Sequence, residues 1–110
     1  MQNKKIKKVK NSKLIAEIPY FQEINDFTKL NKSDIVLDIR DSMESNKRPL
    51  KLKDISVSNF PYFEIHKNFL NLDKNKSYVL YCNYGMMSRL QAIYLYQKGF
   101  RKIKIFSVSI

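Results

Sequence analysis

The stretch that most strongly indicates the fold is residues 77–99, which read SYVLYCNYGMMSRLQAIYLYQKG. Tyr78 to Tyr81 form a short apolar run that is typical of a buried strand. Met86 to Lys98 then predict a helix, and Gly99 follows it at the position where a helix C-terminus favours glycine. We expect one face of this helix to pack on the core through Leu90, Ile93, Tyr94 and Gln97.

Cys82, the only cysteine in the chain, lies between this strand and this helix, and the loop Asn83-Tyr84-Gly85 follows it. The free N–H groups and the positive dipole end of a helix stabilise an anion, so a thiolate forms more easily there. Gly85 permits the tight backbone path that an anion-binding loop requires. The alternative is a buried cysteine that packs as a small apolar side chain. Position alone leaves both interpretations open.

The rest of the chain predicts an alternation of strands and helical segments. Strands are expected at 14–18, 35–39, 54–60 and 100–106, helices at 21–30 and 62–70, and a loop at 42–53. The helix at 21–30 would turn Phe21, Ile24, Phe27 and Leu30 toward the core. This alternation favours an α/β sandwich in which helices flank a mainly parallel central sheet.

Polar residues end two of the predicted strands. Asp38-Ile39-Arg40 closes the strand at 35–39, and Cys82 closes the strand before the long helix. In parallel sheets ligands bind beyond the carboxyl ends of the strands. The sequence therefore predicts that Asp38, Arg40 and Cys82 lie along one edge of the sheet.

Length and composition place limits on the class of protein. The 110 residues are enough for one domain, and 44% hydrophobic residues are enough for a core. No apolar run approaches the roughly 20 residues of a membrane span, and the basic N-terminus lacks the apolar stretch of a secretory signal. A lone cysteine fits a reducing compartment, so we expect a cytoplasmic domain.

The net charge of +11 is concentrated at one end of the chain. Residues 1–13 hold six lysines and no acid and are interpreted as a basic flexible arm, with residues 14–110 as the folded domain. Lys, Asn, Ile, Tyr and Phe supply 53 of the 110 residues, as an AT-rich genome would produce without selection for binding. The basic charge would nevertheless attract RNA through its phosphates, so a possible tRNA contact through the lysines stays open.

Spacing separates several kinds of cysteine chemistry. A C-x5-R phosphatase needs arginine where this chain has Ser88, and Arg89, one residue later, is rotated by about 100° away from the loop. Disulfide exchange needs a second thiol, and His66 shows no sequence relation to Cys82 that would make it a protease base. No metal-ligand cluster is visible. A thiolate that carries a group transiently, such as a persulfide, remains.

The chain resembles a rhodanese (sulfurtransferase) domain, and more closely the one at the C-terminus of bacterial tRNA 4-thiouridine synthetases. The similarity covers about residues 34–106. It runs through VLDIR at 36–40, RPLK at 48–51, NFPYF at 59–63, LYC at 80–82, GMMSRLQA at 85–92 and the last strand. The resemblance implies a rhodanese-like three-layer sandwich and a persulfide formed on a cysteine, with no cofactor and no metal in this chain.

By this resemblance Cys82 accepts the sulfur, and the loop after it supplies N–H donors that hold the persulfide. That loop comprises Asn83, Tyr84, Gly85, Met86, Met87 and Ser88. Asp38 and Arg40 would support the site, and for Arg40 we favour a structural ion pair. Arg89 and Gln91 would belong to the scaffold or to a surface that faces a partner.

The chain departs from the family in two respects. Asn83 and Tyr84 stand where the family usually has charged residues after the cysteine, which weakens the pull on the thiolate or changes the choice of donor. The synthetases also have an ATP-binding domain, an RNA-binding region and a second cysteine, none of which occurs in this sequence.

Two hypotheses follow. In the first, Cys82 takes sulfur from a cysteine desulfurase and passes it to a tRNA-thiolating, ATP-binding synthetase domain, with thiamine thiazole synthesis as a second destination. That synthetase domain would be a separate chain or a missing part of a longer protein of which this chain is a fragment. In the second, the domain is a non-catalytic module that docks a partner protein or tRNA through a basic surface.

Overall fold

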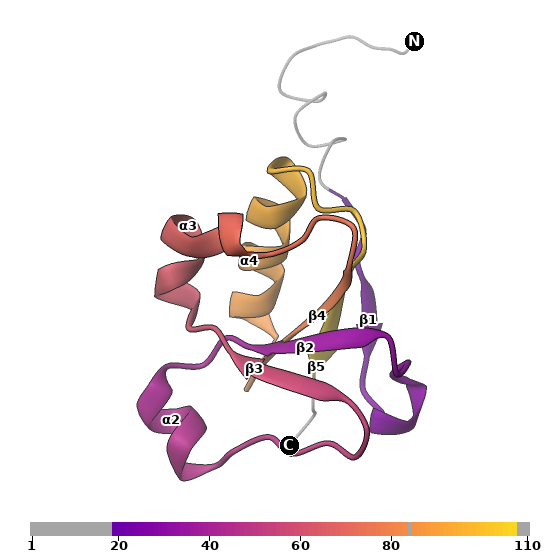
Figure 1. Cartoon of the computed structure of the whole chain (residues 1–110), viewed down its shortest axis with the longest axis vertical. Helices are drawn as coiled ribbons and strands as arrows, with labels where there is room; N and C mark the ends of the chain where they lie inside the picture. Colours follow the sequence, from indigo (N-terminus) through magenta and orange to yellow (C-terminus); the bar gives the residue numbers. More distant parts are fainter. Residues whose placement is uncertain (1–18, 84, 108–110) are drawn as a thin grey trace, which may run out of the picture.

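A computed structural model describes residues 19–83 and 85–107, and in it five strands form one sheet in the order β1-β5-β4-β2-β3 (Figure 1). Every neighbouring pair is parallel. The strands are β1 (Gln22–Ile24), β2 (Asp34–Asp38), β3 (Ser56–Asn59), β4 (Ser77–Cys82) and β5 (Ile103–Ser107). The predicted α/β class with a parallel sheet is confirmed.

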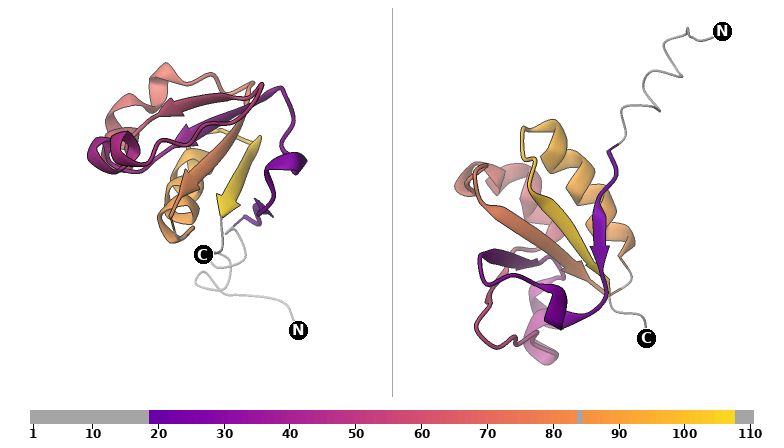
Figure 2. Two further views of the ribbon diagram at one scale, coloured as in Figure 1. Left: turned by 90° about the horizontal axis from the view of Figure 1, so that it is seen from below. Right: turned by 90° about the vertical axis from the view of Figure 1, so that its right-hand side faces the viewer.

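Short helical elements join the strands. They are α2 (Ser42–Lys47), α3 (Ile65–Asn68) and α4 (Met86–Gln97), with 3-10 turns η1 (Phe27–Lys29), η2 (Tyr62–Glu64) and η3 (Phe69–Asn71). The turns η2 and η3 and helix α3 together occupy the region predicted as one helix at 62–70. Both α3 and α4 lie on the same side of the sheet, as Figures 1 and 2 show.

The sheet is buried on both faces. Leu80 of β4 packs with Leu95 of α4 on one face, while Val79 packs with Phe106 on the other. The second face is covered by η1 and by the segment 50–57 rather than by a long helix. Because both faces are covered, the central strands consist of almost continuous apolar runs, which explains why they were predictable.

The helix predicted at 21–30 is wrong. This segment forms the edge strand β1 and the turn η1, in which the Asp26 carboxylate accepts a hydrogen bond from the Thr28 N–H at 3.0 Å, an interaction that lowers the pKa of Asp26. Phe21 packs with the cluster on the α4 side and Ile24 with the cluster on the other side. One helix could not turn these side chains to opposite faces of the sheet.

The loop predicted at 42–53 is also wrong in its first half, which forms α2. Asp41 begins this helix by accepting a hydrogen bond from the Glu44 N–H at 3.0 Å. No residue of α2 is buried, so the segment has no apolar periodicity that would reveal a helix.

Helix α4 begins and ends close to the predicted positions. Of its predicted core face, Tyr94 packs against the core cluster, but Leu90 and Gln97 are exposed. The buried residues of α4 are Ser88, Gln91, Ala92 and Leu95, whereas Leu90 is 54% exposed. The strand predicted at 14–18 lies outside the described residues. Among the described helices, none is long and apolar enough to cross a membrane.

Candidate active site

Cys82 lies at the carboxyl end of β4, where the chain turns into α4. Its side chain is buried, and the Gly85 N–H donates a hydrogen bond to its Sγ at 3.1 Å. Gly85 has a φ of 78°, in the left-handed region, and its carbonyl accepts the first hydrogen bond of α4 from the Arg89 N–H at 3.0 Å. The backbone therefore directs at least one N–H group at the sulfur from the start of a twelve-residue helix.

A cavity of about 420 Å³ opens beside the thiol. Its apolar wall is formed by Ile39, Tyr62, Met86 and Met87. Its polar wall is formed by Arg40, Asp41, Glu44 and Asn83 together with Cys82. The cavity is large enough for a small sulfur compound or for a side chain of another protein.

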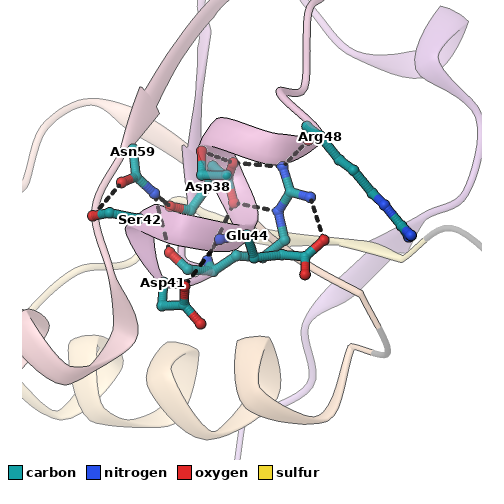
Figure 3. A network of polar contacts seen from close by, with 8 residues as sticks. Asp38, Asp41, Ser42, Glu44, Arg48 and Asn59 are labelled. Atoms are coloured by element: carbon teal, nitrogen blue, oxygen red, sulfur yellow. Dashed lines mark hydrogen bonds and ion pairs between the residues drawn. The ribbon is translucent and has the colours of Figure 1, made fainter.

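The wall contributed by Arg40 is held by a buried ion pair with Asp38. Arg40 Nε and Nη2 donate to the two carboxylate oxygens at 2.9 and 2.8 Å, and this pairing raises the pKa of Arg40 (Figure 3). Nη2 also donates to the Arg48 carbonyl at 2.7 Å, and the Ser45 hydroxyl donates to Asp38 at 2.8 Å. Glu44 lies 3.8 Å from Nη1. Nε and Nη2 of the guanidinium are thus engaged within the protein, and Nη1 has the longer contact with Glu44.

Asn59, at the end of β3, fixes the chain after β2. Its Nδ2 donates to the carbonyls of Asp38 and Arg40 at 2.9 and 3.1 Å, and its Oδ1 accepts from the Ser42 hydroxyl at 3.2 Å (Figure 3). These bonds set the path of the segment that contributes Arg40 and Asp41 to the cavity.

The other predicted site residues are divided between the cavity and the scaffold. Asn83, Met86 and Met87 line the cavity beside Cys82. Ser88 is fully buried in α4, does not line the cavity, and its hydroxyl has no hydrogen-bond partner among the described residues. Tyr84 lies outside the described residues.

Arg89 and His66 do not line the cavity. Arg89 pairs with Glu23 of β1 at 2.6 Å, and its Nη1 lies beside Gly85, 3.6 Å from where a Cβ would stand. His66 is exposed and stacks on Tyr94 with ring centroids 3.7 Å apart. Arg89 therefore joins α4 to the edge strand, and His66 does not line the cavity.

Sequence reasoning missed Asp41, Glu44, Tyr62 and Asn59. Asp41 directly follows the strand-end motif, and Asn59 is the last residue of the neighbouring strand β3, so a search for polar residues at the carboxyl ends of strands would have found both. Glu44 and Tyr62 belong to α2 and η2 and would not have been found in this way.

Comparison with known proteins agrees with this geometry. The sequence profile of the rhodanese-like domain matches residues 22–110. The chain is 46% identical over 77 residues to a tRNA sulfurtransferase of Blochmanniella pennsylvanica, and 42% identical over 84 residues to one of Yersinia enterocolitica. These alignments cover 70% and 76% of this chain but only 16% and 17% of the relatives.

Solved structures share the fold. A rhodanese-related protein of Thermoplasma volcanium superposes with a TM-score of 0.65 at 23% identity, covering 81% of this chain and 86% of that chain. A NAD-dependent persulfide reductase of A. fulgidus gives the same TM-score at 21% identity, covering 90% of this chain and 16% of that chain. From the profile match and the parallel sheet that positions Cys82, we conclude that the chain belongs to the family of rhodanese-like domains.

Proposed function

We propose that this domain is a sulfurtransferase in which Cys82 accepts a sulfane sulfur as a persulfide and passes it on. The observation that carries the proposal is the position of Sγ, which lies beside a cavity at the start of α4 with the Gly85 N–H at 3.1 Å. A persulfide anion needs hydrogen-bond donors, and the beginning of a helix supplies them without any side chain.

The reaction follows from the nucleophilicity of a thiolate. The Cys82 thiolate attacks the outer sulfur of a donor, the bond between the two donor sulfurs breaks, and its electron pair leaves on the donor. The new persulfide then gives up its outer sulfur to an acceptor nucleophile in the same way. Cys82 returns to its starting state, so no net oxidation is required.

The curated relatives are named tRNA sulfurtransferases, and we propose tRNA 4-thiouridine formation as the pathway, with thiamine thiazole synthesis as a second destination. A cysteine desulfurase would supply the sulfur. An ATP-binding synthetase domain, in a separate chain or in another part of a longer protein, would accept it, because residues 1–110 contain no glycine- and serine-rich pyrophosphate loop for activating a uridine.

Intact-mass analysis tests the proposal directly. The protein is incubated with a cysteine desulfurase, pyridoxal phosphate and cysteine, alongside a Cys82→Ala control. We expect a gain of one sulfur atom, which a reducing thiol reverses and which the control lacks. A folded protein that gains no sulfur from an active desulfurase or from 2-hydroxyethyl persulfide would contradict the proposal.

A second candidate function, docking of RNA, is favoured by the distribution of charge. Residues 74–110 contain seven Lys and Arg and no Asp or Glu. Five of these cations, Lys74, Lys76, Lys98, Arg101 and Lys102, lie at the turns that precede β4 and β5, at the end of the sheet opposite Cys82. We call this surface the cationic edge.

Contacts bring the members of the cationic edge together. The Lys74 side chain lies against Gly99, and Lys102 Nζ donates to the Asn75 carbonyl at 3.2 Å. None of the five forms an ion pair with another described residue. Cations that form no ion pair, with no exposed large apolar side chain among them, suit a phosphate backbone better than the apolar centre of a protein interface.

A further inference from the structure

The cavity beside Cys82 offers no free cation among the described residues that line it. Arg40 is the one basic residue there, and its side chain is only 5% exposed. Its guanidinium is already bonded to Asp38 and to the Arg48 carbonyl, with Glu44 nearby. A small anion that entered the cavity could reach Nη1 of Arg40 only in competition with Glu44, and could reach Nε and Nη2 only by breaking their hydrogen bonds.

Two carboxylates at the mouth of the cavity add negative charge. Asp41 is exposed, and the Glu44 side chain is one-third exposed with its ion-pair contact to Arg40 stretched to 3.8 Å. Since Asp38 already neutralises Arg40, the charges of Asp41 and Glu44 are left without a full counter-charge. The carboxylates of Asp41 and Glu44 would therefore repel a dianion that approaches the cavity.

The remainder of the cavity wall is apolar and partly uncovered. Met86 is 70% exposed and Tyr62 is 39% exposed, and both line the cavity together with Met87. Exposed apolar side chains beside a reactive group favour a donor whose sulfur is attached to uncharged, apolar groups.

We propose, resting on the sulfurtransferase function above, that this cavity favours a thiol persulfide, which carries at most one negative charge and reacts as R–S–S–H, over the thiosulfate dianion, with Glu44 as the specificity-determining residue. In the favoured reaction the Cys82 thiolate attacks the outer sulfur of R–S–S–H. The S–S bond of the donor breaks, R–S⁻ leaves with the electron pair, and the proton remains on the sulfur that now belongs to Cys82. With thiosulfate both the donor and the sulfite leaving group would carry two negative charges past Glu44, whereas R–S⁻ carries one.

The persulfide can be presented by a small thiol or by an apolar segment of a donor protein, and separate arms of one experiment distinguish these sources. The rate of sulfur gain on Cys82 is measured by quenched intact-mass analysis with thiosulfate, with 2-hydroxyethyl persulfide and with a persulfidated cysteine desulfurase. Wild type is compared with Glu44→Gln, which keeps the size of the side chain, and with Asp54→Asn. Asp54 precedes β3 at the opposite end of the sheet and does not line the cavity, so Asp54→Asn removes the same charge elsewhere.

We expect the ratio of the thiosulfate rate to the 2-hydroxyethyl persulfide rate to rise about tenfold in Glu44→Gln and to stay unchanged in Asp54→Asn. In wild type, added salt should raise the thiosulfate rate more than it raises the 2-hydroxyethyl persulfide rate. Equal ratios in all three proteins, or wild type that uses both donors equally well, would overturn the selectivity. A folded protein that gains sulfur from none of the three donors would instead overturn the sulfurtransferase function itself.

Discussion

At the scale of single residues, the position of Gly85 requires a left-handed backbone conformation and leaves little room for a side chain, and a larger residue would not meet both conditions. Its φ of 78° lies in the left-handed region, and a Cβ at this position would lie 3.2 Å from the Ser107 hydroxyl. The same conformation directs its N–H at Cys82. The hydrogen bond to the sulfur therefore depends on a backbone shape that glycine adopts without strain.

We predict that Gly85→Ala lowers stability by about 1–2 kcal/mol and also slows sulfur gain on Cys82. Gly99→Ala is the matched control, because Gly99 also has a positive φ of 103° but its nearest neighbour is the flexible Lys74 side chain. Urea unfolding and persulfide formation are measured for both variants. If Gly99→Ala slowed sulfur gain as much as Gly85→Ala, the slower reaction would reflect stability alone.

At the scale of secondary-structure elements, the sequence pattern predicted the strands that are buried on both faces. It failed for helix α4, in which polar residues are buried. Strand β4 was predictable because apolar residues cover both of its faces. The core face of α4 was not, because Ser88 and Gln91 are buried while Leu90 is exposed. The apolar residues at 21–30 have the spacing of a helix face, although their side chains pack on opposite faces of the sheet.

Some residues of the candidate site could be predicted from the sequence and others could not. Cys82 and Asp38 are the last residues of β4 and β2, and Arg40 comes two residues after β2, so a strand prediction was enough to place them. Glu44 and Tyr62 come from α2 and η2, whose positions beside the cavity depend on tertiary contacts such as those of Asn59. No local sequence pattern encodes such contacts.

The corrected face of α4 leads to a stability test. We predict that Leu95→Ala lowers the free energy of unfolding by about 2–5 kcal/mol, because Leu95 is fully buried between α4 and the sheet. Leu90→Ala should change it by less than about 1 kcal/mol, since half of this side chain is exposed. Denaturant unfolding of both variants measures these changes. A larger loss of unfolding free energy for Leu90→Ala than for Leu95→Ala would mean that the Leu90 face of α4 packs on the core.

At the scale of the whole molecule, the cationic edge and the thiol lie at opposite ends of the sheet. Carboxylates of Asp41 and Glu44 stand at the end that carries Cys82, and the cationic edge occupies the other end. The six residues of β4 separate these ends by about 17 Å at the usual rise of a strand. RNA bound to the cationic edge would therefore leave the thiol free to meet a sulfur donor.

We predict that Lys74→Gln combined with Lys102→Gln weakens binding of unmodified tRNA and reduces the salt dependence of its affinity by about 1.4–1.8 logarithmic units per decade of salt. The matched control combines Lys47→Gln and Lys51→Gln, which removes two exposed charges outside the cationic edge. Fluorescence anisotropy across a salt series provides the measurement. Equal losses in both double variants would mean that total charge, and not this surface, governs the attraction.

The strand order has a consequence for how the chain folds. β5, the last described strand, lies between β1, the first, and β4 (Figure 1). Their register joins Glu23 with Ile105 and Cys82 with Ser107. Such distant pairings give a high contact order, which slows folding. We expect the insertion of β5 to be a late step, so that a growing polypeptide acquires its finished sulfur-binding loop only after nearly all of the domain has been synthesised.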